Sequence, residues 1–285
     1  MWRPRRGVNV AIGDLRIVAA PQHALHADLP AIFECGRHNA RIGVIRRDLS
    51  ASRNLASQDS KTMNTLIGQQ IQGRAVLVLG SAPGAVVPEE YDRSSWCLIC
   101  VNASGWTARR LNLGTPDITI VTSGALRKSR TSNIEMRAAI DGLNTDTLIV
   151  RLITRNPLKR TLVQLKVQLR LRRLNFGRKR LLFFGRDVWT PILDATIGPR
   201  LRSSEGDSFH VSTGVFACLV ATYFGANRIY VAGIDPESVG HSYSTSNLPR
   251  HHIFADRLAI QELRARNDFF FCHPKRIESV SSNSD

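Results

Sequence analysis

Short apolar runs recur along the chain from about residue 73 to residue 274. Most lack the alternation that marks a strand with one face in water, so both faces of each strand should be covered, as in a parallel sheet. The runs are Ala75–Leu79, Trp96–Val101, Ile118–Val121, Thr147–Leu152, Arg180–Phe184, Arg228–Ala232 and Asp268–Cys272. Helix-length stretches separate them, so the pattern predicts a doubly wound, mostly parallel Rossmann-like α/β sheet of about seven strands.

Two helices of this pattern have clear limits. Ser212 or Thr213 is expected to cap a helix that stops at Gly225, directly before the sixth strand. A second helix is expected from Phe254 to Arg266, before the last strand. These two units complete the predicted domain.

The segment 151–186 is strongly basic and less clear in structure. Val163, Val167 and Leu171 belong to an alternation that an edge strand would show, whereas another set of apolar residues marks a helical face: Leu158, Leu162, Leu165, Leu169 and Phe176. We favour a helix, because Gln, Lys, Arg and Leu are good helix formers. It is either a solvated surface element or a surface that binds an anionic membrane or acidic polymer.

Composition sets the domain limits around this pattern. A chain of 285 residues with 43% hydrophobic content supports one main core. Residues 1–72 form a basic, poorly ordered extension in this interpretation, residues 73–275 form the nucleotide-binding domain with a basic insert at 151–186, and residues 276–285 form a flexible tail. No apolar run is long enough for a membrane-spanning helix, so we expect a cytoplasmic protein, peripheral at most.

The cysteines indicate reduced thiols. They are odd in number and mostly lie in apolar surroundings: Cys35, Cys97, Cys100, Cys218 and Cys272. Cys97 and Cys100 have a C-x-x-C spacing, but they lie inside a predicted buried strand. No second pair completes a zinc site, so metal and redox roles are disfavoured.

The formal net charge of +16 favours anionic ligands such as nucleotides, nucleic acid or acidic lipids. Much of the excess lies between Thr147 and Arg186, a stretch without any Asp or Glu.

The first strand ends in Gly80-Ser81-Ala82-Pro83-Gly84. Open α/β sheets bind ligands at the carboxyl ends of their strands, and glycine turns there allow backbone amides to approach a phosphate. The turn has neither the G-x-G-x-x-G nor the Walker pattern, which disfavours a dinucleotide oxidoreductase and a P-loop kinase.

Neutral polar residues follow the next two strands. Asn102 ends the second strand, and Thr122 and Ser123 end the third. Their side chains can offer hydrogen bonds to a base, ribose or phosphate; ordinary helix capping is the alternative for Ser123.

More polar residues come from the carboxyl-terminal half. Ser212, Thr213 and Gly214 begin a helix, where free amides and hydroxyls can meet an anion, and Gly233 and Asp235 end the sixth strand.

Histidines and a tyrosine follow that strand. His241, Tyr243, His251 and His252 are expected near the ligand-binding edge. His251 can remove a proton from an attacking hydroxyl, because imidazole titrates near neutral pH. The alternative is a surface loop that happens to contain histidines.

Four segments carry a resemblance to a known family. Val211–Asp235, Ser242-Tyr243, the 251–263 helix and Val78–Asn102 together resemble the bacterial CMP-sialic acid-dependent α-2,3-sialyltransferases. The resemblance implies a GT-A-like variant of the fold and a metal-independent, inverting transfer from CMP-sialic acid, or a related CMP-sugar, to a glycan hydroxyl. It implies no cofactor and no metal.

The resemblance also assigns residues. Gly80, Ser81 and Asn102 take the places of nucleotide-binding residues, Ser212 to Gly214 match a nucleotide-contacting Thr-Ser-Gly, and Tyr243 matches one of two tyrosines that stabilise the leaving phosphate.

His251 matches the catalytic base of that family, five residues before a matching Asp256. The sequence departs from the family at three points. Glu237 replaces the second tyrosine, His210 replaces an arginine, and the stretch 243–251 is shorter than the usual lid.

Two other functions remain open at this point. One is a different Rossmann-like transferase, similar to a pterin diphosphokinase, which would need magnesium and ATP. The other is a non-catalytic protein whose basic insert binds nucleic acid or anionic lipid. For the transferase, we expect a nucleotide-sugar donor and a glycan acceptor as partners, contact of segment 151–186 with the inner face of a membrane, self-association, and no specific nucleic acid.

Overall fold

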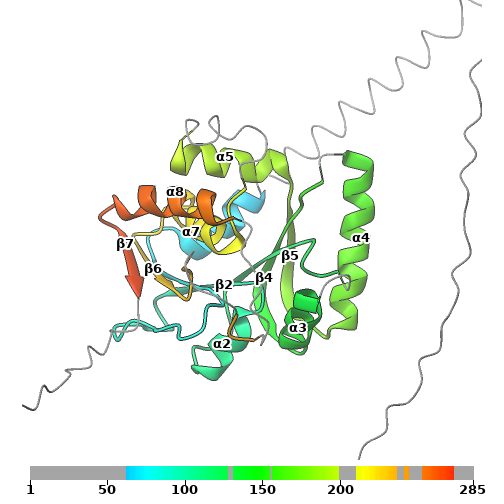
Figure 1. The fold of residues 1–285 in the computed structure, drawn as a ribbon, viewed down its shortest axis with the longest axis horizontal. Helices are drawn as coiled ribbons and strands as arrows, with labels where there is room; N and C mark the ends of the chain where they lie inside the picture. The colour runs from blue at the N-terminus through cyan, green and yellow to red at the C-terminus, as the bar shows by residue number, and fades with distance from the viewer. Residues whose placement is uncertain are drawn as a thin grey trace, which may run out of the picture. The chain divides into compact units, whose positions relative to one another are not determined.

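The strands expected from the apolar runs form a single parallel sheet. The computed structural model describes residues 62–127, 131–154, 156–198, 210–235, 241–243 and 252–272. The strands are β1 (Ala75–Leu79), β2 (Cys97–Val101), β3 (Ile118–Thr122), β4 (Asn144–Arg151), β5 (Gly177–Phe184), β6 (Arg228–Ala232) and β7 (Phe269–Cys272). They pair in the order β5-β4-β3-β2-β1-β6-β7, which confirms the predicted doubly wound α/β fold (Figure 1).

The strand order contains one reversal. From β1 the chain adds strands outward to β5, then returns to place β6 on the other side of β1. The connections that leave β1 and β6 therefore diverge, and in open α/β sheets ligands bind at the carboxyl ends of such a strand pair. Ligand-binding residues are therefore expected among those that follow β1 and β6.

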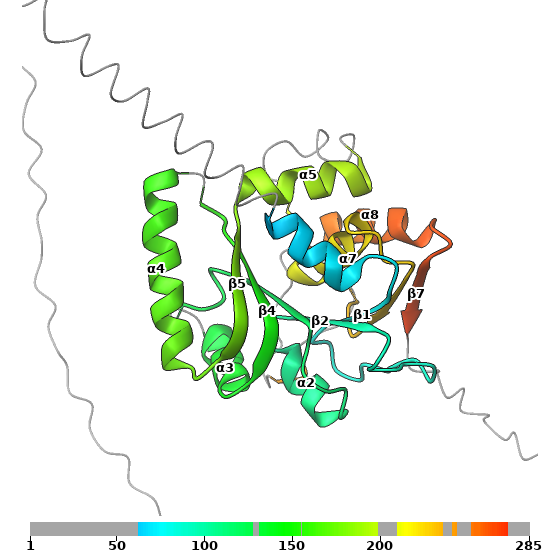
Figure 2. The same cartoon turned by 180° about the vertical axis from the view of Figure 1, so that it is seen from behind.

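Helices cover both faces of the sheet, as Figures 1 and 2 show. One face carries α2 (Ser104–Arg110), α3 (Thr131–Ile140) and α4 (Pro157–Arg173). The other carries the helix at 62–71 together with α5 (Arg186–Ile197), α7 (Thr213–Tyr223) and α8 (Ile253–Arg264). Successive residues of a strand pack against opposite helix layers. In β1, Val76 and Val78 pack in the layer of α7, and Leu77 and Leu79 pack in the layer of α2.

Two strands are longer than the apolar pattern suggested. β4 begins at Asn144 and β5 at Gly177, and these two residues are paired in register. The added residues are mostly polar, and in β5 Lys179 and Arg180 are exposed. Pairing at a sheet margin tolerates polar side chains, so hydropathy alone misses these strand ends.

Positions 163–171 of the basic segment lie in helix α4 and not in an edge strand; the edge strand of this segment is β5. Asn156 caps it by accepting a hydrogen bond from the Lys159 N–H at 3.2 Å, and Pro157 occupies the first turn. Val167 and Leu171 are buried against β4, whereas the leucines of the expected helical face are exposed. Phe176 is buried beyond the end of the helix and does not extend that face.

The helix at 62–71 lies within the extension expected for residues 1–72. Its Ile67 and Ile71 are fully buried in the same core as α7. The folded region therefore begins earlier than the apolar strands indicated. Residues 1–61 and 273–285 lie outside the described residues.

The C-x-x-C pair is divided between the two faces of β2. Cys97 packs with the α7 layer and Cys100 with the α2 layer, since residues three apart on a strand point in opposite directions. Burial raises the pKa of both thiols, that of Cys100 to about 12. Cys218 is also buried and free, and burial raises its pKa as well.

We expect Cys97, Cys100 and Cys218 to resist alkylation in the native protein at neutral pH. Their raised pKa values keep the thiols protonated, and the thiolate is the reactive form. Iodoacetamide labelling followed by peptide mass spectrometry, before and after addition of denaturant, measures this. Rapid native labelling of Cys97 or Cys100 would contradict the described packing of β2.

Candidate functional site

The turns after β1 and β6 are in direct contact at the switch point. The N–H of Gly80 donates to the Ala232 carbonyl at 2.7 Å, and the N–H of Ala82 donates to the Gly233 carbonyl at 2.9 Å. A Cβ on Gly80 would overlap the Gly233 carbonyl group, and Gly233 has a φ of +65°. Both glycines are needed for this approach. Two amides of the turn are therefore used internally, and Ser81 between them is 8% exposed.

Ile234 connects these turns to the start of α7. Its side chain lies where a Cβ on Gly80 would stand, and a Cβ on Gly214 would come within 3.2 Å of it. Two segments far apart in sequence, the Gly80 turn and the Ser212-Thr213-Gly214 motif, therefore pack against one residue. The predicted nucleotide-binding motifs meet at one place on the sheet edge.

The amino terminus of α7 is held by two hydrogen bonds. The Ser212 hydroxyl accepts from the Val215 N–H at 3.3 Å, which confirms the predicted cap. The Ser212 N–H donates to Asp256 Oδ1 at 2.7 Å, and Asp256 is only 4% exposed. Asp256 lies in the first turn of α8, so the two helix starts are fixed to each other.

Residues 241–243 cross over the Gly80 turn. Ser81 Oγ and His241 Nδ1 are 3.0 Å apart, and the Ser242 N–H donates to the Ser81 carbonyl at 2.7 Å. On the other side, the hydroxyls of Ser242 and Thr107 are 2.9 Å apart, which ties the segment to α2. The rings of His241 and Tyr243 are stacked, with centroids 5.1 Å apart.

Asn102 follows β2 and precedes Ala103, the N-cap residue of α2. Its φ of 52° is in the left-handed region, which asparagine tolerates better than most residues. Its N–H donates to the Ile120 carbonyl at 2.9 Å, but its buried Oδ1 has no hydrogen-bond partner among the described residues. This oxygen therefore has an acceptor position open to a ligand, a water molecule or a residue outside the described ranges.

Thr122 and Ser123 have local roles at the end of β3. The Thr122 hydroxyl accepts from the Ala125 N–H at 3.3 Å, as a turn residue would. Ser123 is 4% exposed, and its N–H donates to the Arg151 carbonyl at 3.0 Å. Both residues stand at the predicted edge.

Arg151 is a buried cation near the start of α7 that the sequence identifies only as part of the basic insert. It ends β4, is 5% exposed, and donates from Nη1 to the Val211 carbonyl at 3.0 Å. Its guanidinium lies 5.0 Å from the Trp189 ring centre and 4.7 Å from that of Phe216. Its position inside the apolar run Thr147–Leu152, where it is the one cation, was the available signal.

Burial lowers the pKa of Arg151 to about 10, and the carboxylate of Asp256 opposes this shift. Arg151 therefore remains charged at neutral pH and supplies a buried positive charge beside the segment that precedes α7. This charge is favourable for an anionic ligand at that edge.

His251 and Glu237 lie outside the described residues, so the roles assigned to them remain predictions. His252 caps α8, and its carbonyl accepts from the Asp256 N–H at 2.9 Å. Asp235 is partly buried after β6. Within the described ranges, no group of three or more His, Cys, Asp or Glu side chains is placed to hold a metal ion.

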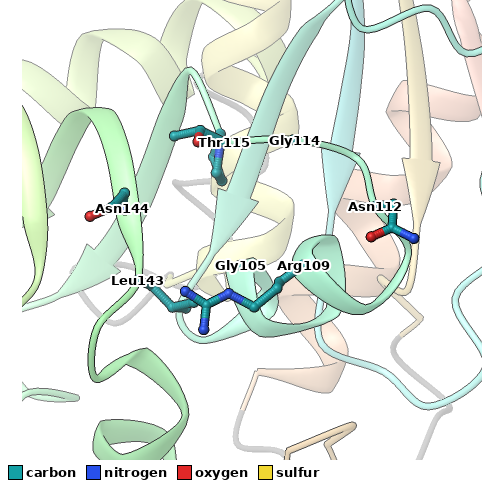
Figure 3. A pocket seen from close by; sticks show the side chains of 8 residues that line it. Gly105, Arg109, Asn112, Gly114, Thr115, Leu143 and Asn144 are labelled. Atoms are coloured by element: carbon teal, nitrogen blue, oxygen red, sulfur yellow. The ribbon is translucent and has the colours of Figure 1, made fainter.

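A pocket of about 320 Å³ lies at the opposite edge of the sheet (Figure 3). Its lining includes Pro116, which precedes β3, and Asn144, which begins β4, so it faces the amino ends of the strands. Arg109 extends from α2 toward Leu143 and donates to the Gly142 carbonyl at 3.1 Å. The pocket is thus separate from the candidate site.

Comparisons with known proteins find structural neighbours but no sequence relatives. No family model matches the sequence, and no curated protein matches it significantly. The structure is similar to that of the Campylobacter jejuni sialyltransferase CstII in complex with CMP-3FNeuAc, with 14% identity and a TM-score of 0.40 over 70% of this chain and 78% of that one. It is also similar to the monofunctional alpha-2,3-sialyltransferase Cst-I of Campylobacter jejuni, with 12% identity and a TM-score of 0.46 over 73% and 78% of the two chains. Similarity this low leaves the reaction to be argued from the residues of the site.

Gly80→Ala should destabilise the protein by at least about 2 kcal/mol, because the new methyl group overlaps backbone that has little room to move. Gly124→Ala is the matched control, since a Cβ there meets nothing within 4 Å, and we expect a change within about 0.5 kcal/mol. Urea denaturation of both variants measures the difference. Equal stability of the two variants would mean that the turns are not in contact.

Proposed function

We infer that this chain is a glycosyltransferase that transfers a sugar from a CMP-sugar of the CMP-sialic acid type to a hydroxyl of a glycan, with inversion. The supporting observation is the buried amide oxygen of Asn102, which has no hydrogen-bond partner among the described residues and follows β2, the strand paired with β1. An amide in a fixed backbone conformation can recognise a nucleobase or ribose through donor and acceptor hydrogen bonds.

The arrangement suits a nucleotide sugar from which CMP departs as the leaving group. Asn102 and Ser81 would bind the nucleoside, and the start of α7 at Ser212, Thr213 and Gly214 supplies a favourable helix terminus for negative charge. Thr122, Ser123, Ala82, Gly233 and Asp235 complete the edge as binding residues in this proposal. Since the donor is itself the substrate, the proposal needs no cofactor.

The Tyr243 phenol would donate a hydrogen bond to the phosphate oxygens of the departing CMP. The bond from the anomeric carbon to the phosphate oxygen breaks as the acceptor oxygen attacks from the opposite face, and CMP leaves with the bonding electron pair. Donors fixed before the reaction stabilise that charge without reorganisation. The ring of Tyr243 is stacked on that of His241.

His251 would accept the proton of the attacking hydroxyl as general base. It precedes His252, the residue whose carbonyl accepts from the Asp256 N–H at the start of α8. Asp256 in turn binds the Ser212 N–H, so the segment that carries the base is linked to the donor-binding end of α7. This link gives Asp256 a positioning role.

Asn102→Gly should weaken CMP binding about tenfold, the value of one or two lost hydrogen bonds, and leave stability nearly unchanged because glycine accepts the left-handed φ. Asn112→Gly is the matched control, since Asn112 has a φ of 54° and lines the pocket at the far edge. Calorimetric titration with CMP, UMP, UDP and ADP measures both affinity and base preference. Equal loss in the two variants, or no preference for CMP, would contradict the assignment.

His251→Ala should lower sugar transfer from CMP-sialic acid by about 100-fold or more while CMP affinity is retained, because a general base acts on the acceptor. His252→Ala removes the neighbouring imidazole and should retain transfer. The assay follows CMP release and glycan product with and without magnesium and ATP. Formation of AMP from ATP with magnesium, without CMP release, would instead support a diphosphokinase-like enzyme, and unchanged transfer by His251→Ala would refute the base.

A further inference from the structure

Helix α4 has two apolar faces, and only one of them is used by the fold. Val167 and Leu171 are buried in the core beneath α3 and β4. On the opposite side, Leu158, Leu162, Leu165 and Leu169 are 79%, 56%, 53% and 53% exposed. We call these four residues the leucine stripe. Four large apolar side chains in water on one helix require an explanation beyond folding.

The leucine stripe is regular. Its residues are spaced four, three and four apart, which places them within about 60° of one another on a helix of 3.6 residues per turn. The helix has 17 residues and so is about 26 Å long. In Figures 1 and 2 it stands at the outer end of the sheet, beyond β5. The stripe is therefore presented along one side of an elongated surface element.

Positive charge borders the leucine stripe. Arg172 and Arg173 lie on either side of it, and Lys159 and Lys166 lie further around one flank; all four are exposed. Arg160 is paired with Asp187 and is not counted with them. Because the stretch from Thr147 to Arg186 has no Asp or Glu, its own residues cannot neutralise these cations.

More guanidinium groups lie close by. Burial lowers the pKa of Arg170, and repulsion from Arg127 and Arg137 lowers it further, so these three cations lie close together near α3 and α4. An anion near them would relieve this repulsion.

We propose that α4 docks on an anionic lipid surface, with the leucine stripe inserted into the acyl boundary and the flanking cations on lipid phosphates. A helix with leucines on one face and Lys and Arg beside them binds in the plane of a membrane interface. Within the described residues no helix is long and apolar enough to span a membrane, so this contact is of the peripheral kind.

Other occupants fit the charge or the leucines, but not both. A second copy of α4 would cover the leucines yet bring Arg172 and Arg173 against equally cationic residues. Residues 1–61 also carry more Arg and Lys than Asp and Glu, so they would not neutralise the flank. Nucleic acid would pair with the cations and leave the stripe in water.

Cosedimentation of the full chain with vesicles tests the proposal. We expect binding to vesicles in which phosphatidylglycerol makes up about a third of the lipid, weaker binding at about 0.5 M salt, and little binding to phosphatidylcholine alone. Leu162→Gln with Leu165→Gln should weaken binding by about tenfold or more, because two leucines no longer insert. Leu111→Gln, at the C-cap of α2 where the side chain is 42% exposed, should have no effect.

Thermal melting of each variant, followed by circular dichroism, establishes that it is folded. Vesicle binding that survives the leucine double variant would overturn the proposal and point to the charges alone, as would equal binding to DNA. Dissociation of a dimer by the double variant, with no vesicle binding by the parent, would overturn it in favour of self-association. Sugar transfer takes no part in this assay, so its outcome is independent of the proposed function.

Discussion

The contact between the Gly80 and Gly233 turns governs the geometry of the candidate site. These turns leave adjacent strands at the point where strand order reverses, and they can meet only because neither glycine has a side chain. The contact places Ser81 beneath residues 241–243 and lets Ile234 pack under the start of α7. A few backbone atoms thus bring four separate stretches of sequence to one edge.

A second, polar layer fixes the α7 side of that edge. Asp256 accepts a hydrogen bond from the Ser212 N–H. Arg151, whose guanidinium lies over two aromatic rings, donates to the Val211 carbonyl. Buried charges are costly unless paired, and removing one would leave the other without compensation. These contacts fix both the N–H and the carbonyl that lie directly before α7.

The sequence was sufficient for the strands because buried parallel strands are apolar throughout, and β1 and β6 were predicted with the bounds that the structure has. It was also sufficient for the α7 cap, since Ser212 acts through a local hydrogen bond. It was insufficient for Arg151, whose burial depends on Trp189 and Phe216 from other elements. From composition alone, this residue is indistinguishable from surface charge. Tertiary packing is what separates it from the exposed arginines of α4.

The two margins of the sheet bear on how the protein behaves at high concentration. A parallel sheet with open edges offers unpaired backbone groups to other chains, and long apolar edges lead to aggregation. Here β7 has only four residues, and β5 carries the consecutive cations Arg178, Lys179 and Arg180. Two such β5 edges repel each other. The two arginines and the lysine at the start of this strand therefore disfavour the addition of a β5 strand from a second chain to the edge of the sheet.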